Sequence, residues 1–199
     1  MRHAPYLALV VILVVIAAVV KPASSEKQKY DYVGMQDCSK CHGTSALGNQ
    51  VSVWLTTPHA RAARVLRTER ASLIAKKVNV SNPSEDPACL KCHTTGGGKN
   101  QKLSSEGVGC EACHGPASAY GEITNHAPYG DKEKDYLRAQ SFGMYKIIGI
   151  DGIKLRERMC RRCHTLERPC APENADERKH QELALSVIAD FVFRHPLRK

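Results

Sequence analysis

The chain has 199 residues and a formal net charge of +9, from 29 Lys and Arg against 20 Asp and Glu. The basic excess invites a nucleic-acid partner, but no basic block interleaved with aromatic residues occurs, so we expect none. Only three Phe and one Trp are available for a core, whereas the chain has nine Cys and nine His.

The first 25 residues have the pattern of a secretory signal peptide. Arg2 supplies positive charge, residues 7–20 are an unbroken apolar run, and residues 23–25 are small enough for cleavage. The run is short for a membrane-spanning helix, although an uncleaved anchor is the alternative. We therefore expect a signal peptide over 1–25, then a single domain over 26–199 without a stable membrane span.

Downstream, residues 30–48 are loop-rich, and residues 50–53 form a turn that leads into a helix. That helix is predicted to begin with Thr57 as N-cap and Pro58 in the first turn, and to run to about Lys77. Asn, Ser and two prolines in residues 79–87 predict a linker.

The second half of the chain contains three further candidate helices. Residues 131–140 are charged and predict a short helix, and residues 154–163 predict another. The apolar stripe in residues 176–193 predicts an amphipathic helix. Residues 142–153 are apolar and glycine-punctuated, and fit a strand or a loop.

Four copies of Cys-x-x-Cys-His run through the chain. Their cysteines and histidines are Cys38, Cys41 and His42, then Cys89, Cys92 and His93, then Cys110, Cys113 and His114, then Cys160, Cys163 and His164. In c-type haem attachment the two thiols form thioethers with one porphyrin, and the histidine is the proximal iron ligand. We therefore expect four covalently bound haem c groups.

Two other kinds of site use paired cysteines. Zinc binds Cys-x-x-Cys pairs, but it does not need a histidine directly after every second cysteine. A redox-active dithiol would account for one pair and not for four identical ones. Both alternatives fit the four motifs less well than haem does.

Four haems change the expected fold and charge. Without residues 1–25 the formal charge is +7, and about eight propionate charges would bring the holoprotein near neutrality. With so few large apolar side chains, the porphyrins themselves are expected to form the core. We predict a mainly α-helical and irregular fold with a haem-packed core and little sheet. The short gap between the second and third motifs predicts that their haems are neighbours.

The irons need sixth ligands or stay open. Apart from His3 in the signal, the histidines outside the motifs are His59, His126, His180 and His195. Neutral imidazole is a common metal ligand, so these four are the candidate distal ligands. Each also has an ordinary alternative as a polar surface or turn residue.

Three methionines and one cysteine remain to be considered. Met35, Met144 and Met159 are rival iron ligands, although methionine more often fills gaps in a core. Cys170 lies outside the motifs. It fits a buried free thiol, or an intermolecular disulfide in an exported protein.

Several short segments resemble one tetrahaem cytochrome family, whose founding type accepts electrons from hydroxylamine oxidoreductase. These segments are Tyr32-Val33-Gly34, Trp54 with Pro58-His59-Ala60, Pro87-Ala88-Cys89, and residues 107–116 with the sequence Gly-Val-Gly-Cys-Glu-Ala-Cys-His-Gly-Pro. The chain also resembles tetrahaem extracellular cytochromes of metal-reducing organisms that polymerise into conducting filaments.

The resemblance implies His59 as a distal ligand. It also shows a departure, because Tyr120 stands where family members often have a histidine soon after Cys-His-Gly-Pro. His126, six residues further on, is the candidate replacement. In the founding type one haem lacks a sixth ligand, so the resemblance does not imply four saturated irons.

We predict an exported, periplasmic or extracellular tetrahaem cytochrome that passes electrons between redox donor and acceptor proteins and is not an enzyme. The alternative is a haem enzyme that reduces small nitrogen oxides at a five-coordinate haem. A further interpretation is a head-to-tail filament, with His126 or His195 donated to the neighbouring subunit.

Overall fold

The computed structural model describes residues 30–171 and 173–179, and this part of the chain is helical without a strand. The α-helices are α2 (Met35–His42), α3 (Gln50–Leu55), α4 (Ala62–Val65), α5 (Glu69–Lys77), α6 (Pro87–His93), α7 (Glu111–His114), α8 (Ile123–His126), α9 (Lys132–Ser141) and α10 (Gly149–Arg161). Single 3₁₀ turns are η1 (Ser45–Leu47), η2 (His59–Arg61), η3 (Thr95–Gly98) and η4 (Gln101–Leu103). The prediction of a mainly α and irregular fold is confirmed. The predicted signal peptide, His180 and His195 lie outside the described residues.

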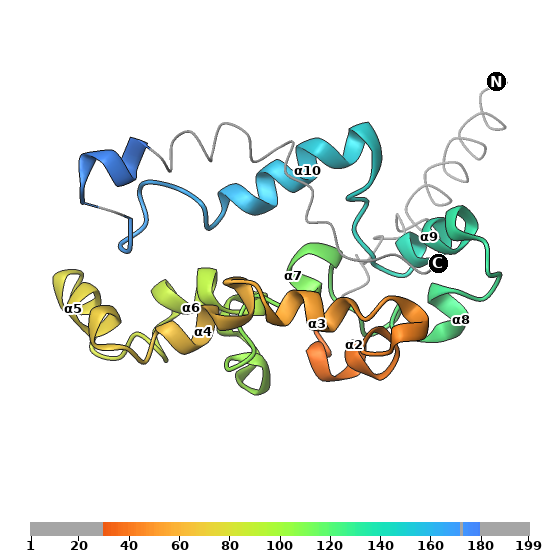
Figure 1. The fold of residues 1–199 in the computed structure, drawn as a ribbon, viewed down its shortest axis with the longest axis horizontal. Helices are drawn as coiled ribbons and strands as arrows, with labels where there is room; N and C mark the ends of the chain where they lie inside the picture. The colour runs from red at the N-terminus through yellow and green to blue at the C-terminus, as the bar shows by residue number, and fades with distance from the viewer. Residues whose placement is uncertain (1–29, 172, 180–199) are drawn as a thin grey trace, which may run out of the picture.

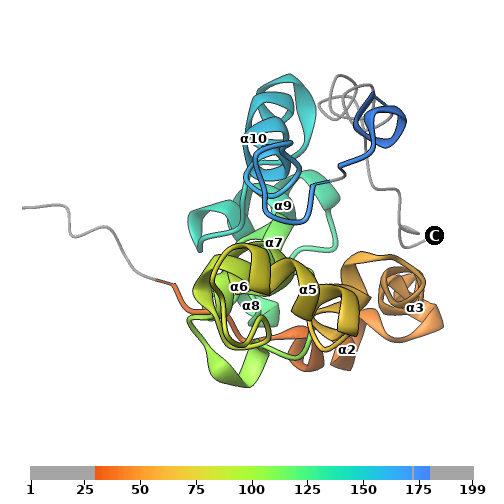
Figure 2. The same ribbon diagram turned by 90° about the vertical axis from the view of Figure 1, so that its left-hand side faces the viewer.

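The helices form an elongated molecule (Figure 1). Helices α2 to α5 follow one another along its length, α6 turns back beside α4, and α10 runs alongside them, with α8 and α9 at one end. The end-on view keeps α10 apart from α2, α3 and α5 (Figure 2). Within the described ranges, no helix is long and apolar enough to cross a bilayer.

The predicted helix from Thr57 to Lys77 is interrupted. Its first part is the 3₁₀ turn η2 followed by the short α4, and a new helix, α5, begins at Glu69. The break has a local cause, since the Thr68 side chain accepts a hydrogen bond from the Ala71 N–H and caps α5. A β-branched hydroxyl residue inside a helical pattern thus began a second helix.

The later elements agree better with the sequence. Helix α9 begins after Asp131, whose carboxylate accepts from the Glu133 and Lys134 N–H groups. Helix α10 begins at Gly149, so the undecided segment 142–153 is partly helical and contains no strand. Of the predicted helix over 176–193, residues 176–179 are helical and the remainder lies outside the described residues.

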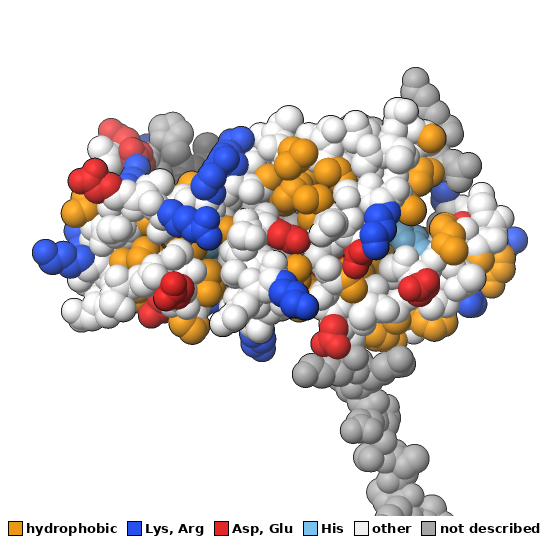
Figure 3. Space-filling model, turned by 90° about the horizontal axis from the view of Figure 1, so that it is seen from below, with side chains coloured by type: hydrophobic (Ala, Val, Ile, Leu, Met, Phe, Trp, Pro, Cys, Tyr) orange, Lys and Arg blue, Asp and Glu red, His pale blue; other side chains and the backbone are white. Residues whose placement is uncertain are grey.

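The protein core is small. The buried hydrophobic residues in the described ranges are Val51, Ala63, Leu66, Ala75, Leu90, Leu103, Ala117, Tyr120 and Ala139. One cluster joins Ala117, Tyr120 and Ala139, with Val33, Phe142 and Met144 packed against it. One face carries hydrophobic side chains among charges of both signs (Figure 3). These buried side chains are too few and too small to form a full hydrophobic core by themselves, so further apolar groups must complete it.

A buried carboxylate joins the start of the described chain to the third motif. Glu111 is 2% exposed. Its carboxylate accepts from the Val33 N–H at 3.0 Å, the Gly34 N–H at 2.7 Å and the Ala117 N–H at 2.7 Å. Charge-assisted bonds to backbone N–H groups are among the stronger hydrogen bonds in proteins. Glu111 therefore fixes residues 33–34 and Ala117 on either side of α7.

Replacing Glu111 should destabilise the fold. Glu111→Ala leaves three backbone N–H groups without their acceptor, at a cost of about 1–3 kcal/mol for each one that stays buried and unpaired. Glu111→Gln keeps one acceptor oxygen and should lose less. Guanidinium chloride unfolding of the oxidised holoprotein, followed by far-UV circular dichroism, measures both.

The exposed Glu122→Ala is the matched control and should unfold at the midpoint of the unmodified protein. Equal midpoints for Glu111→Ala and Glu122→Ala would refute the structural role assigned to Glu111.

Candidate haem-binding sites

Each Cys-x-x-Cys-His motif lies on or at the end of a helix. The first ends α2, the second lies in α6, the third spans the start of α7, and the fourth closes α10. Cysteines three residues apart on a helix share one face. The two sulfurs of each motif can therefore reach one planar group from the same side.

Sulfurs of different motifs also meet. Hydrogen bonds join Cys38 to Cys110 and Cys92 to Cys163. The second and fourth motifs are also tied reciprocally, since the Cys92 Sγ lies 3.8 Å from the Arg162 O and the Cys163 Sγ lies 3.9 Å from the Lys91 O. These contacts set the first motif beside the third and the second beside the fourth.

Several of the motif thiols are buried enough to have a raised pKa. Burial raises the pKa of Cys113 to about 11 and, with the nearby Cys92, the pKa of Cys163 to about 12. The hydrogen bond with Cys110, followed by burial, raises the pKa of Cys38. Zinc binds the thiolate, whereas a thioether sulfur is neutral. Among the described residues, no group of three or more Cys, His, Asp or Glu side chains is arranged to hold a metal ion, which also argues against a zinc site.

Two proximal histidines are oriented by partners on their Nδ1 atoms. The His93 Nδ1 lies 2.7 Å from the Ala62 O, and the His42 Nδ1 lies 3.2 Å from the Gln50 Oε1. Metal-binding histidines almost always use the second ring nitrogen for such a bond, which fixes the tautomer. In both residues Nε2 is left to face a metal.

Two of the predicted distal histidines lie opposite proximal ones. The ring centroids of His42 and His126 are 5.8 Å apart, and those of His59 and His164 are 5.9 Å apart. Two imidazoles on opposite sides of one metal have centroids about 6 Å apart, since the metal–nitrogen bond is about 2 Å and the centroid lies about 1 Å further. Both separations fit an iron between the rings.

Three of the four rings in these pairs have a lowered pKa. Burial lowers the pKa of His59, and burial together with the neighbouring ring lowers the pKa of His126 and of His164. Neutral imidazole is the form that binds iron. The predicted distal residues are therefore in the protonation state that ligation requires.

His59 is held by the loop before the third motif. The Val108 N–H donates to the His59 O at 3.0 Å, and the Trp54 Nε1 donates to the Val108 O at 2.8 Å. Gly107 has φ +79°, and a Cβ there would lie 2.5 Å from the His59 O. Only glycine allows this approach, so the loop and His59 depend on each other.

His126 is held from another direction. It ends α8, and the Arg138 Nε of α9 donates to the Thr124 O at 2.6 Å. The Tyr120 ring meets the His126 ring edge-on, with centroids 5.9 Å apart. Tyr120 therefore packs against His126.

Two further observations fit a haem. The Nε of Arg156, on α10 before the fourth motif, is buried without a hydrogen-bond partner. An unpaired guanidinium N–H suits a propionate. Beside the second motif, Val65 and Val78 are 43% and 41% exposed, yet they line a cavity that also contains His93.

The rival ligands take different places. Met144 packs against the small core cluster, which is the gap-filling role. Met35 and Met159 are half-buried on α2 and α10. Cys170, for which the sequence fits a buried free thiol or an intermolecular disulfide, is half-buried and lies in the cavity of the second motif. Its hydrogen bond with His93 lowers the pKa of Cys170 and raises that of His93.

Gly107→Ala should displace His59. The new Cβ would clash with the His59 O and force the loop or η2 to move, so one low-spin haem should become high-spin. Gly130→Ala is the matched control, because Gly130 also has positive φ, +67°, but a Cβ there meets nothing within 4 Å. Electron paramagnetic resonance of both oxidised variants measures the effect. Identical spectra for the two variants would contradict the link between Gly107 and His59.

Comparison with known proteins agrees with this geometry. Residues 37–115 match the profile of the family described as cytochrome c554 and c-prime. The chain is 33% identical over 95 residues to cytochrome c-554 of Nitrosomonas europaea, an alignment that covers 43% of this chain and 38% of that protein. The chain thus matches less than half of that relative's length. No solved structure matches the chain. The resemblance predicted from the sequence is confirmed: over residues 37–115, which hold three of the four motifs, the chain matches the cytochrome c554 and c-prime family.

Proposed function

We propose that this chain is an exported tetrahaem c-type cytochrome that carries electrons one at a time and has no catalytic site of its own. The observation that carries the proposal is the pairing of His42 with His126 and of His59 with His164 at the separation of two ligands on one iron. Bound haem supplies a one-electron iron couple. The four Cys-x-x-Cys-His motifs would hold four such groups.

In this proposal the side chains act as fixed ligands and spacers. His126 would hold one iron together with His42, and His59 would hold another together with His164, which would leave no open position for a substrate on those two irons. Ligand identity, burial and hydrogen bonds to the ligands set each potential. His180 and His195 remain the candidates from the sequence for the second and third motifs.

The contacts between motifs support an order for electron transfer. Cys38 bonds Cys110, so the first motif neighbours the third. Cys113 lies near enough to Cys160 to raise its own pKa, and Cys163 bonds Cys92. We infer the order first, third, fourth, second, with the first and second haems at the two ends.

Place and partners follow from the sequence. The pattern of residues 1–25 supports export, so we propose a periplasmic or cell-surface location. Covalent haem attachment occurs on that side of the membrane in bacteria. The partners would be a redox donor and a redox acceptor protein. Charges of both signs lie on the face seen in Figure 3.

A reductase acting on small nitrogen oxides is the second candidate. It needs one iron without a sixth ligand, as the family resemblance noted from the sequence implies for one haem. The histidine pairs leave the second and third motifs as its possible locations. A haem there that binds nitric oxide or carbon monoxide rapidly would favour this function.

Copies of this chain could also assemble head to tail into a filament, as the resemblance to filament-forming tetrahaem cytochromes suggests. Ile148 and Ile150 are 63% and 85% exposed at the start of α10 and could bury apolar surface against a second copy. His126 already faces His42 of its own chain. A ligand donated between subunits would therefore be His195.

The mature protein should carry four covalently bound haems. Its intact mass after acid–acetone extraction should exceed the mass of the polypeptide by four haem groups, because thioethers survive extraction. Loss of haem on extraction, or zinc in its place, would contradict the proposal.

His59→Gly and His126→Gly should each open one iron. In either variant one of the four low-spin signals in electron paramagnetic resonance should become high-spin, and added imidazole should restore it. Met144→Leu is the matched control for a rival ligand and should leave all four signals unchanged. A spectrum that is the same in His59→Gly as in the unmodified protein would remove His59 from the ligand set.

A further inference from the structure

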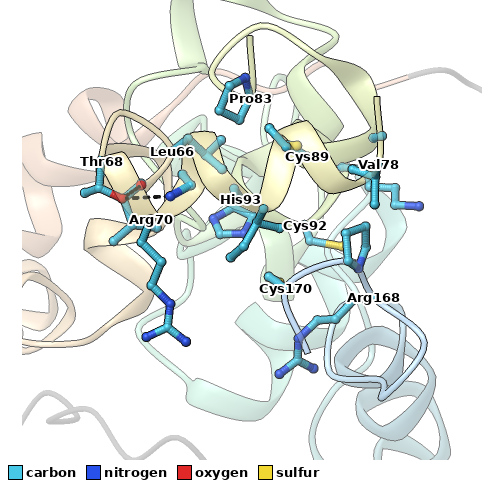
Figure 4. Close-up of a pocket in the computed structure, with 17 residues that line it drawn as sticks. Leu66, Thr68, Arg70, Val78, Pro83, Cys89, Cys92, His93, Arg168 and Cys170 are labelled. Atoms are coloured by element: carbon cyan, nitrogen blue, oxygen red, sulfur yellow. Dashed lines mark hydrogen bonds between the residues drawn. The ribbon is translucent and has the colours of Figure 1, made fainter. Parts of the chain in front are cut away.

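The second motif faces an apolar cavity of about 270 Å³ (Figure 4). Helices α4 and α5 and the loop before α6 supply its apolar wall, which includes Val65, Leu66, Ile74, Val78 and Pro83. From α6 it receives Cys89, Cys92 and His93. The cavity is therefore the place for the haem of this motif, if the proposed function holds.

A residue from a distant part of the chain also enters this cavity. Cys170 follows the fourth motif, and Figure 4 shows it beside His93 and Cys92, with Arg168 next to it. The thiol of Cys170 forms a hydrogen bond with the His93 ring and another with Arg168. It is the one cysteine of nine that no haem-attachment motif uses.

The orientation of His93 decides which ring atom faces Cys170. The Nδ1 atom already lies 2.7 Å from the Ala62 O, so it donates there. The hydrogen bond with Cys170 then engages Nε2, which is the atom that a proximal histidine presents to iron. The sulfur therefore lies on the iron-facing side of His93.

We propose that Cys170 is the second protein ligand of the iron held by His93, so that the haem of the second motif has histidine–thiolate ligation. The inference rests on the proposed function, because it needs a haem at this motif. Thiolate is an established haem ligand. Arg168, beside the sulfur, compensates the negative charge of the thiolate.

This ligand changes the account of the other irons. Cys170 completes the second motif, so only the third still needs a ligand from His180 or His195. An anionic sulfur stabilises ferric iron relative to a second imidazole. The second haem should therefore have the lowest reduction potential of the four. It also lies at one end of the inferred electron-transfer order.

Electron paramagnetic resonance and near-infrared magnetic circular dichroism of the oxidised holoprotein test the proposal. The unmodified protein should show one low-spin haem of histidine–thiolate type, with a narrower spread of g values than the bis-histidine haems. Cys170→Ser should remove that signal and convert one of the four haems from low-spin to high-spin. Cys170→His should keep all irons low-spin and replace the thiolate signal by a bis-histidine one.

Glu173→Gln is the matched control, since it alters only the exposed ion pair with Lys77 near Cys170. It should leave the thiolate signal intact. Intact mass should show four haems in every variant, which separates this inference from the proposed function: fewer than four haems would refute the function, whereas four haems without a thiolate signal would refute only the ligand.

Two further results would overturn the proposal. One is an unmodified spectrum with four haems and no thiolate signal, which needs no variant to fold. The other is rapid alkylation of Cys170 by iodoacetamide in the native ferric protein, with no change in the iron spectrum. Resistance to alkylation until the protein is unfolded supports iron-bound sulfur.

Discussion

The apolar side chains buried in the described part of the chain are few and small, and Tyr120 is their one aromatic member. Burial of apolar surface is the main favourable term in folding. A chain with so few buried apolar side chains therefore needs a bound apolar group, here the haems, to bury against. The cavity beside the second motif and the sulfur contacts between motifs indicate where the haems would lie. On this account, short helices and single turns suffice because their task is to surround four flat groups and present ligands to them.

The most specific stretch of the sequence, residues 107–116, has a structural explanation. Gly107 allows the backbone of His59 to approach, and Glu111 binds the N–H groups of residues 33 and 34. Gly115 has φ +91°, and a Cβ there would lie 2.8 Å from the Gly143 O. One ten-residue segment thus positions the candidate ligand His59, the start of the described chain and the turn that contains Gly143. Such a segment should tolerate few substitutions, and its residues 107–115 lie within the region that matches the cytochrome c554 and c-prime family.

The sequence predicted the parts of the site that depend on local spacing. The four motifs and the helical character of the chain could be found from residue order, and His59 and His126, candidates from the sequence, lie close to His164 and His42. The break before Thr68 was missed because a side-chain cap competed with a continuous helical pattern. Loop length suggested that the second and third haems are neighbours, whereas the sulfur contacts join the first motif to the third and the second to the fourth. Contacts between distant segments depend on tertiary packing, which residue spacing does not encode.

Cys170 illustrates the same limit. By sequence it lies outside the haem-attachment motifs, and its place beside His93 appears only when the loop after α10 is folded against α6. Ligand identity in a multihaem chain is thus a tertiary property, whereas haem attachment is a local one. Candidate proximal ligands can be read from the motifs, whereas the sequence names candidate distal histidines without saying which motif each one faces.

The central claim is that the haems are the core of this protein. Hydrogen–deuterium exchange measured by mass spectrometry tests it most directly, by comparing the holoprotein with the same chain produced without haem attachment. The account predicts strong protection of α4 to α7 and α10 in the holoprotein and its loss throughout the haem-free chain. A haem-free chain that retains native-like protection in these helices would contradict it.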